Sequence, residues 1–518
     1  MMSVYFTQNW NVTKPAARST KGIVVSQSRL AAEAGVEILQ SGGNAIDAAV
    51  ATAFSLAAVE PWNTGLGAIG FMVVHRAGQK AAEIVDFGPI SPGHTDPAAY
   101  PLSGGTQAQL FTWPAVKDDR NIHGPLSFAV PTATDGYGLA IERWGRKSFA
   151  EVLAPAIRLA KRGLPQDWWS TLKIATAALD LRRYPESRRV FLPNDLPPVP
   201  PQAGAPGFFK LGRLDETMER LARLGRRDFY EGGIAADIAA DTKAIGGVLD
   251  GNDLKSYRAR VLPALAIPYR GMNVQAPGGM TAGPTLADTL GRLDRVEFGS
   301  MPDATAFVAY AEAMRAAYVS RLDQLGDVKA ETCTTHLTVV DGEGTMVALT
   351  TTLLSTFGSR VVLPTTGILM NNGIMWFDPR PGRANSIAPS KRPLSNMCPI
   401  VVARDGRPWI AAGASGGRRI MSAVLQLMSF TLDFGLGAEA SAHRPRIDVS
   451  GGDEVMVDRR MEPEVVKALG AKFPLEMVEH GANPVNFSCP NMIVVNADGS
   501  RTGISDVMSP WSAAVAEA

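Results

Sequence analysis

A β-hairpin two thirds of the way along the chain constrains the fold most. The segment TTHLTVVDGEGTMVALTTT reads as two strands joined at Gly342–Gly344, a three-residue connection in which glycine accepts a left-handed conformation. With a regular register, Asp341 pairs with Thr345 and Thr334 faces Thr352. Directly opposed Cβ atoms lie about 4.5 to 5.5 Å apart, so this register brings two threonine hydroxyls within hydrogen-bonding reach.

Strand and helix patterns occur at both ends of the chain, with few linkers and no internal repeat. We therefore expect one α/β body whose sheets draw on both halves of the sequence. A proline-rich stretch at 192–207 is interpreted as a surface loop. Apolar periodicity predicts strands at 21–26, 69–75, 335–341, 345–352, 359–364, 398–404, 408–413 and 491–506, and helices at 28–43, 48–59, 148–163, 304–327 and 418–435.

The charge balance and the cysteines narrow the class of function. The 518 residues include 51 lysines and arginines against 50 aspartates and glutamates, which argues against nucleic acid or an anionic membrane surface as a partner. Cys333, Cys398 and Cys489 have no metal-ligand spacing, so we expect no metal, no disulfide framework and no cofactor. No apolar signal region or membrane span is evident, and we expect a cytoplasmic protein with a small-molecule substrate.

A threonine at the start of such a hairpin is a candidate nucleophile. Threonine pairs in strands are usually structural, because threonine favours β-structure. A threonine hydroxyl becomes reactive when a base takes its proton, and the residue's own α-amino group, with a pKa near 7.7 to 8.0, is one such base. That arrangement requires the Cys333–Thr334 bond to be cut. In self-cleavage the hydroxyl attacks the preceding carbonyl, the acyl group shifts from nitrogen to oxygen, and water hydrolyses the ester.

Several motifs make the chain resemble the γ-glutamyltransferase family of N-terminal nucleophile hydrolases. They are AAEAGVEILQSGGNAIDAAVATAFSLAAVEPWNTGLGAIGFMVV, AEAMRAAYVSRLDQLGD, the hairpin, GILMNN, KRPLSNMCP, GASGGRRI and GISD. The resemblance implies an α+β fold, a four-layer αββα sandwich. It also implies cleavage into a large subunit, residues 1–333, and a small subunit, residues 334–518, which remain together as one interwoven heterodimer. A dimer of heterodimers is one possible assembly.

The resemblance assigns roles to the site residues. Thr334 matches the nucleophile, and Thr352 matches the threonine that hydrogen-bonds it. Gly416 and Gly417 match the pair whose backbone N–H groups form the oxyanion hole. The sequence around this pair reads independently as strand, glycine turn and helix start, where free N–H groups favour a developing negative charge.

At the positions that bind the acyl group in the family, this chain keeps some residue types and replaces others. Ser395 and Asn396 stand where the family has a Ser-Ser pair contacting the acyl head, although a simple turn after proline is an equally good interpretation. The family's glutamyl-binding arginine is replaced by Gly88, and its ammonium-binding aspartate by Trp376. Gly373 and Leu354 replace a glutamine and an asparagine nearby.

These departures predict the substrate class. Burying a zwitterionic glutamyl head without its partners would cost several kcal/mol, so γ-glutamyl substrates are not expected. Among the family's activities, hydrolysis of oxamate to oxalate and ammonia fits best, because oxamate has a carboxylate and no ammonium. Arg360 is the candidate cation for that carboxylate. Arg392, Arg418 and Arg419 are the alternatives, and each arginine also has an ordinary structural interpretation.

Three other interpretations stay open. Within the family, the rival is an acylase for larger acyl groups, of the cephalosporin-acylase type. From another class, Gly413–Gly417 fits the G-x-S-x-G nucleophile elbow of serine hydrolases, with Ser415, Asp448 and His480 in the required order. The hairpins after Thr334 do not fit the parallel sheet of that class. An inactive scaffold is the third interpretation.

Overall fold

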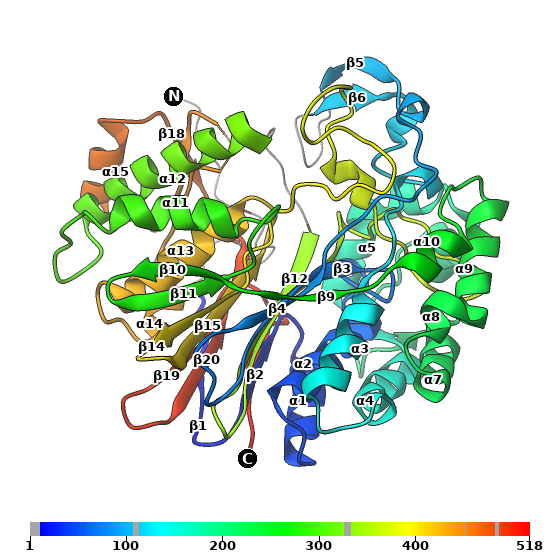
Figure 1. The fold of residues 1–518 in the computed structure, drawn as a ribbon, viewed down its shortest axis with the longest axis horizontal. Coiled ribbons are helices and arrows are strands. Elements are labelled where there is room, and N and C mark those ends of the chain that lie inside the picture. Colours follow the sequence, from blue (N-terminus) through cyan, green and yellow to red (C-terminus); the bar gives the residue numbers. More distant parts are fainter. Residues whose placement is uncertain (1–10, 107–112, 326–332, 451, 482–485) are drawn as a thin grey trace.

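The computed structural model describes residues 11–106, 113–325, 333–450, 452–481 and 486–518. Two seven-stranded sheets pack face to face, and helices cover the outer face of each sheet (Figure 1). Helices α1 to α4 lie on one side of the sandwich, and α11 to α13 lie on the other. The expected four-layer αββα sandwich is confirmed.

The first sheet contains the hairpin at its centre. Every neighbouring pair of its strands is antiparallel. Its order is β21 (Ala513–Ala516), β2 (Ile23–Ser26), β12 (Cys333–Val340), β13 (Met346–Leu354), β3 (Ile69–His75), β4 (Glu83–Phe87) and β9 (Arg260–Pro263).

The second sheet is also antiparallel throughout. Its order is β1 (Ala17–Ser19), β20 (Arg501–Ser505), β19 (Cys489–Val495), β15 (Arg407–Ser415), β14 (Ile400–Arg404), β11 (Met272–Ala276) and β10 (Leu265–Tyr269). Each sheet therefore combines strands from before and after residue 333, as the sequence pattern predicts.

The two helical layers differ in sequence origin. The first sheet is covered by α1 (Arg29–Gln40), α2 (Ala45–Val59), α3 (Ala133–Trp144) and α4 (Phe149–Arg162), followed outward by α5 (Trp168–Leu181), α6 (Pro185–Phe191), α7 (Leu214–Leu224), α8 (Asp228–Glu231), α9 (Gly233–Ala244) and α10 (Gly251–Ser256). The second is covered by α11 (Gly283–Leu293), α12 (Ala304–Leu325), α13 (Arg419–Leu432), α14 (Ala438–His443) and α15 (Pro463–Gly470).

Helix α2 contains the uncharged apolar stretch at 48–59 and is a buried helix of the core. All 15 of its residues are buried, between the first sheet and the outer helices. Asn44 caps its first turn by accepting from the N–H groups of Ile46 and Asp47. Within the described residues, no helix has both the length and the apolar character needed to cross a bilayer.

The remaining elements are short. They are β5 (Leu102–Thr106), β6 (Pro114–Val116), β7 (Leu164–Pro165), β8 (Phe208–Phe209), β16 (Ile447–Asp448), β17 (Val455–Asp458), β18 (Leu475–Val478), and five 3₁₀ turns at Pro97–Ala99, Lys117–Asp119, Pro125–Ser127, Pro193–Asp195 and Gly373–Trp376.

The strand predicted at 359–364 is wrong. Arg360 has a φ of 64°, which breaks the extended conformation at the start of the segment. Only the single bridge between Val362 and Leu369 forms, and the chain folds into a tight loop closed by the bond from Leu363 N to Ile368 O, 2.9 Å long. The apolar run is buried, which explains the strand-like pattern.

Candidate active site

The central hairpin has the predicted register over most of its length. Thr335 pairs with Thr351, and the ladder continues regularly to Val340 and Met346. Asp341 N donates to Thr345 O at 3.2 Å, closing the predicted loop. The hairpin prediction is therefore confirmed from Thr335 onward.

The ladder changes at Thr334 itself. Cys333 pairs with Leu354, so Thr334 lies opposite two residues, Thr352 and Leu353, in a β-bulge. Leu354 has a φ of 88°, and its N–H donates to Thr352 Oγ1 at 2.8 Å instead of extending the ladder. The simple one-to-one pairing predicted for Thr334 and Thr352 is corrected to this bulged arrangement, because the strand turns at Leu354.

Contacts across the sandwich bring the start of β12 beside the end of β15. His336 contacts the backbone at Gly413, where an added Cβ atom would lie 2.2 Å from its Cε1 atom. Gln27, just beyond β2, donates to Ser415 Oγ on the facing sheet. Burial lowers the pKa of His336 to about 3, so its imidazole is neutral at physiological pH. Thr334, on the same face of β12 as His336, is 3% exposed.

The glycine turn after β15 has the features of an oxyanion site. Gly416 and Gly417 have φ angles of 135° and 66°, which favour glycine. A Cβ atom at Gly416 would lie 2.4 Å from Ser488 Oγ. Within the described part of the chain, neither glycine N–H donates a hydrogen bond, and α13 begins two residues later. These N–H groups are available to a developing negative charge.

The candidate acyl-contact pair is held by buried hydrogen bonds. Ser395 N donates to Met280 O at 2.7 Å, and Ser395 O accepts from Arg321 Nη2 at 2.7 Å. Asn396 Oδ1 lies 3.4 Å from the same nitrogen. The turn carrying the pair is thus anchored to α12 and to the loop before α11.

The four departures from the family pattern are closely packed, mainly against apolar side chains. Trp376 and Leu354 are buried in one cluster with Phe71, between the two sheets. A Cβ atom at Gly88 would lie 2.5 Å from Cζ of Phe71, so the phenyl ring occupies the space of a side chain there. Gly373 sits against Ala129, whose Cβ atom would lie 2.6 Å from an added Cβ. Apolar side chains therefore fill much of this region, while Arg392 Nη1 donates to Asp86 Oδ1 at 3.1 Å and to Gly88 O at 3.4 Å beside it.

The arginines proposed as carboxylate partners already have acidic neighbours. Arg360 Nε lies 3.7 Å from Asp180, and its Nη1 donates to Ser355 Oγ and Gly358 O within its own loop. Arg392 Nη1 lies 3.1 Å from Asp86. The role of Arg360 in binding substrate stays a prediction.

The other two candidates lie at the start of α13. Arg419 Nε lies 3.9 Å from Asp448 Oδ2, and Arg418 Nη1 donates to Ser450 O at 3.2 Å. Both side chains therefore contribute to the packing around the glycine turn.

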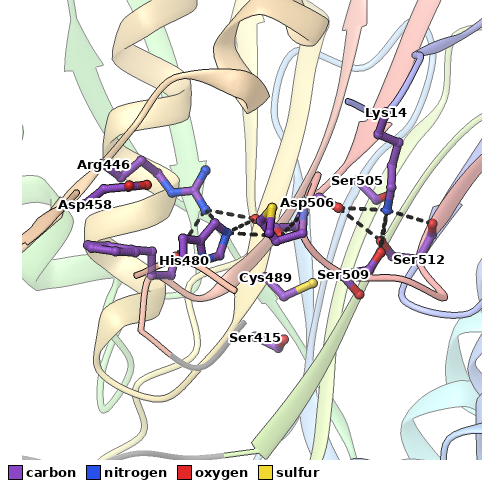
Figure 2. A network of polar contacts seen from close by, with 12 residues as sticks. Lys14, Ser415, Arg446, Asp458, His480, Cys489, Ser505, Asp506, Ser509 and Ser512 are labelled. Carbon is purple, nitrogen blue, oxygen red and sulfur yellow. Dashed lines mark hydrogen bonds and ion pairs between the residues drawn. The ribbon is translucent and has the colours of Figure 1, made fainter. Parts of the chain in front are cut away.

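The serine-hydrolase triad is not assembled. His480 Nε2 lies 3.1 Å from Asp506 Oδ2, and Arg446 Nη2 donates to the same oxygen at 2.9 Å. Asp448 instead accepts from Ser450 Oγ at 2.7 Å. Figure 2 shows His480 linked to Asp506 and Arg446, with no dashed line to Ser415. The order Ser-Asp-His in the sequence does not correspond to a catalytic contact.

Two buried charged groups near the site were missed by the sequence interpretation. Arg321 falls on the buried stripe of α12, seven residues after Met314, so an ionisable residue at an apolar helical position was the available signal. Glu60 follows α2 directly, and its Oε1 accepts from Asn63 Nδ2 at 2.8 Å. Burial raises the pKa of Glu60 to about 7, partly offset by the hydroxyl of Thr335, next to the candidate nucleophile.

The fold and the site together define an N-terminal nucleophile hydrolase. The model of one family, Gamma-glutamyltranspeptidase, matches residues 31–334 and 329–516. The chain belongs to the gamma-glutamyltranspeptidase family.

Its relatives include proenzymes with different activities. A glutathione hydrolase proenzyme of Escherichia coli is 30% identical over 95% of this chain and 91% of that protein. Acylase ACY 1 proenzyme of Pseudomonas sp. strain SE83 is 30% identical over 95% of this chain and 92% of that protein. The crystal structure of cephalosporin acylase from Bacillus halodurans superimposes with a TM-score of 0.85 at 23% identity, covering 100% and 99% of the two chains, which shows the shared fold.

Removing the Thr352 hydroxyl tests the bulge. Thr352→Val keeps the β-branched volume but deletes the acceptor for the Leu354 N–H group. Without this bond the turn at the end of β13 is weakened, and the Thr334 hydroxyl is no longer held in its orientation. We expect activity to fall about a hundredfold, as for a positioned proton-transfer partner. Initial rates and the rate of chain cleavage measure the effect. Thr338 lies on β12, on the same face of the sheet but remote from the bulge, and Thr338→Val should retain near wild-type activity. Equal behaviour of the two variants would contradict the role given to Thr352.

The raised pKa of Glu60 predicts a pH-dependent stability. The unfolded chain ionises this carboxyl near its ordinary pKa of 4.5, whereas the folded chain retains the proton up to about pH 7. The free energy of unfolding should therefore fall as pH rises between these values. Glu60→Gln removes the ionisable carboxyl and therefore this loss. The stability difference between the variant and wild type should shift in favour of the variant by about 2.5 kcal/mol between pH 5 and pH 8. Denaturant unfolding at both pH values tests this, and an equal gain would refute it.

Proposed function

We propose that the protein is an amidohydrolase that activates itself by cutting the Cys333–Thr334 bond. Thr334 Oγ1 attacks the Cys333 carbonyl carbon, the C–N bond breaks, and the resulting ester is hydrolysed by water. The products are a new carboxylate at Cys333 and a free amine at Thr334. The observation that carries this proposal is that Thr334 is buried at a strand bulge, on a strand that packs against β15.

In turnover, the free amine of Thr334 takes the proton of its own hydroxyl, and Oγ1 attacks the substrate amide. The oxygen of the tetrahedral intermediate accepts from the N–H groups of Gly416 and Gly417, which need no reorganisation because their φ angles are already set. The Thr334 ammonium gives its proton to the substrate nitrogen, the C–N bond breaks, and ammonia or an amine leaves. Water then hydrolyses the acyl ester and restores the Thr334 hydroxyl. Thr352 orients the nucleophile from the facing strand.

The acyl group proposed is that of an acid amide without an α-ammonium. Gly88 and Trp376 stand in place of the charged partners that the family offers a glutamyl zwitterion, and the Phe71 ring further restricts the space. Oxamate, with one carboxylate and a two-carbon skeleton, is the smallest substrate that satisfies these limits. Its hydrolysis would give oxalate and ammonia.

A second candidate is an acylase for a longer acyl chain. The buried apolar side chains of Trp376, Leu354 and Phe71 suit methylene groups better than a second carbonyl. The similarity to Acylase ACY 1 proenzyme favours the same alternative. Glutaramate, an acid amide with three methylene groups between its carbonyl carbons, represents this class in the experiments below.

Self-cleavage gives the first functional test. The 55.1 kDa chain should yield fragments of roughly 35 and 20 kDa, in proportion to 333 and 185 of 518 residues, with the smaller beginning at Thr334. Thr334→Ala should remain one chain, because it has no hydroxyl to attack Cys333. Intact mass and N-terminal sequencing provide the measurement. Cleavage of the alanine variant at the same bond would show that Thr334 is not the nucleophile.

Substrate preference gives the second test. The processed enzyme should hydrolyse oxamate or glutaramate with a kcat/KM at least about a hundredfold above that for γ-glutamyl anilide, because Gly88 and Trp376 replace the family's charged partners for the glutamyl head. Release of ammonia or aniline is followed directly. Efficient turnover of the anilide would contradict the proposed acyl class, whereas turnover of glutaramate alone would select the acylase.

A further inference from the structure

Arg321 is a buried cation at the base of the acyl-contact turn. It projects from α12 and is 6% exposed. Its Nη1 donates to Thr281 O at 2.8 Å and to Thr285 Oγ1 at 3.0 Å, while its Nη2 donates to Ser395 O and approaches Asn396 Oδ1. The guanidinium thus joins three segments: α12, the start of α11, and the turn that carries the acyl-contact pair.

All four of these acceptors are uncharged. Within the described ranges, Arg321 forms no ion pair with a carboxylate, whereas Arg360, Arg392 and Arg419 each have an aspartate within 4.0 Å. A second arginine, Arg418, lies close enough to Arg321 to oppose its charge, and burial lowers the pKa of Arg321 to about 10. The guanidinium remains cationic at neutral pH, and among the described side chains its hydrogen-bond partners named above are all neutral.

A buried, uncompensated arginine is costly, and an anion beside it recovers part of that cost. The neutral hydrogen bonds fix the plane of the guanidinium but leave its charge unbalanced. Ser395 O and Asn396 Oδ1 contact this guanidinium, and the resemblance to the family implies that the same two residues contact the acyl group. A carboxylate bound at their hydroxyl and amide groups would lie in the field of Arg321.

We propose that Arg321 makes the site selective for an anionic acyl group: it positions the Ser395–Asn396 turn and supplies the positive charge that balances a substrate carboxylate. Arg321 is a positioning residue, because it acts through this pair. This inference rests on the proposed amidohydrolase function and deepens it, since it names the charge of the acyl group and moves the cation from Arg360 to Arg321.

The experiment compares acid amides with neutral diamides of the same size. Oxamate is paired with oxamide, and glutaramate with glutaramide, so each pair differs by one charge. Arg321→Gln retains a hydrogen-bond donor but removes the charge. It should raise KM for the acid amide and lower its kcat/KM relative to the diamide at least tenfold, about 1.4 kcal/mol. Arg321→Lys retains the charge and should keep the acid-to-diamide ratio within about threefold of wild type.

Two further variants make the outcome decisive. Arg315→Gln removes an exposed arginine of the same helix, which pairs with Asp453 at 2.9 Å, and should leave the ratio unchanged. Arg360→Met tests the competing cation. All variants are compared after complete chain cleavage and at matched thermal stability, so that a folding defect is recognised.

The possible results separate the two proposals. An equal loss for acid amide and diamide in Arg321→Gln means a purely structural role and overturns the inference while leaving the amidohydrolase intact. A selective loss in Arg360→Met alone assigns the cation to Arg360 and also overturns it. Failure of the processed wild type to hydrolyse either pair refutes the proposed substrate class, and the inference falls with it.

Discussion

The site depends on the close approach of two sheets at one backbone position. His336 packs directly on the main chain at Gly413, where no other residue fits without displacing the imidazole. This contact fixes how far β12 and β15 are apart and which of their residues come together. Asn491 on β19, the neighbour of β15, donates from Nδ2 to His336 O and holds the two sheets together at the same position. The nucleophile position and the glycine turn both lie just beyond this contact, each at the end of its strand.

Strain is concentrated where the hairpin leaves the sheet. Leu354 holds a φ of 88°, a conformation that asparagine accepts more readily than leucine. The resembled family has asparagine here, so this chain has exchanged a polar residue suited to the turn for an apolar one. Burial of the leucine side chain and the bond from its N–H to Thr352 Oγ1 offset the strain. Such strain is typical of functional sites, and under the proposed function the leucine supplies an apolar contact for the substrate.

Much of the fold followed from local patterns, and the rest required contacts that sequence does not display. Period-two alternation located β3 and most of the central hairpin, and apolar spacing located α4 and α13. The false strand at 359–364 arose because a buried irregular loop has the same apolar composition as a strand. The bulge at Thr334 depends on a single backbone angle at Leu354, which propensity does not reveal. Arg321 and Glu60 gain their properties from burial among distant segments, so their pKa values follow only from the assembled structure.

The distribution of charge links these departures into one pattern. Replacing an arginine and an aspartate of the family by Gly88 and Trp376 removes one charge of each sign, so the pair of exchanges leaves the net charge of the pocket unaltered. The ammonium-binding aspartate of the family is absent, while Arg321 contacts the Ser395–Asn396 turn. Under the proposed function, a site that combines the Arg321 cation with these apolar side chains is complementary to an acyl group with one carboxylate and no ammonium.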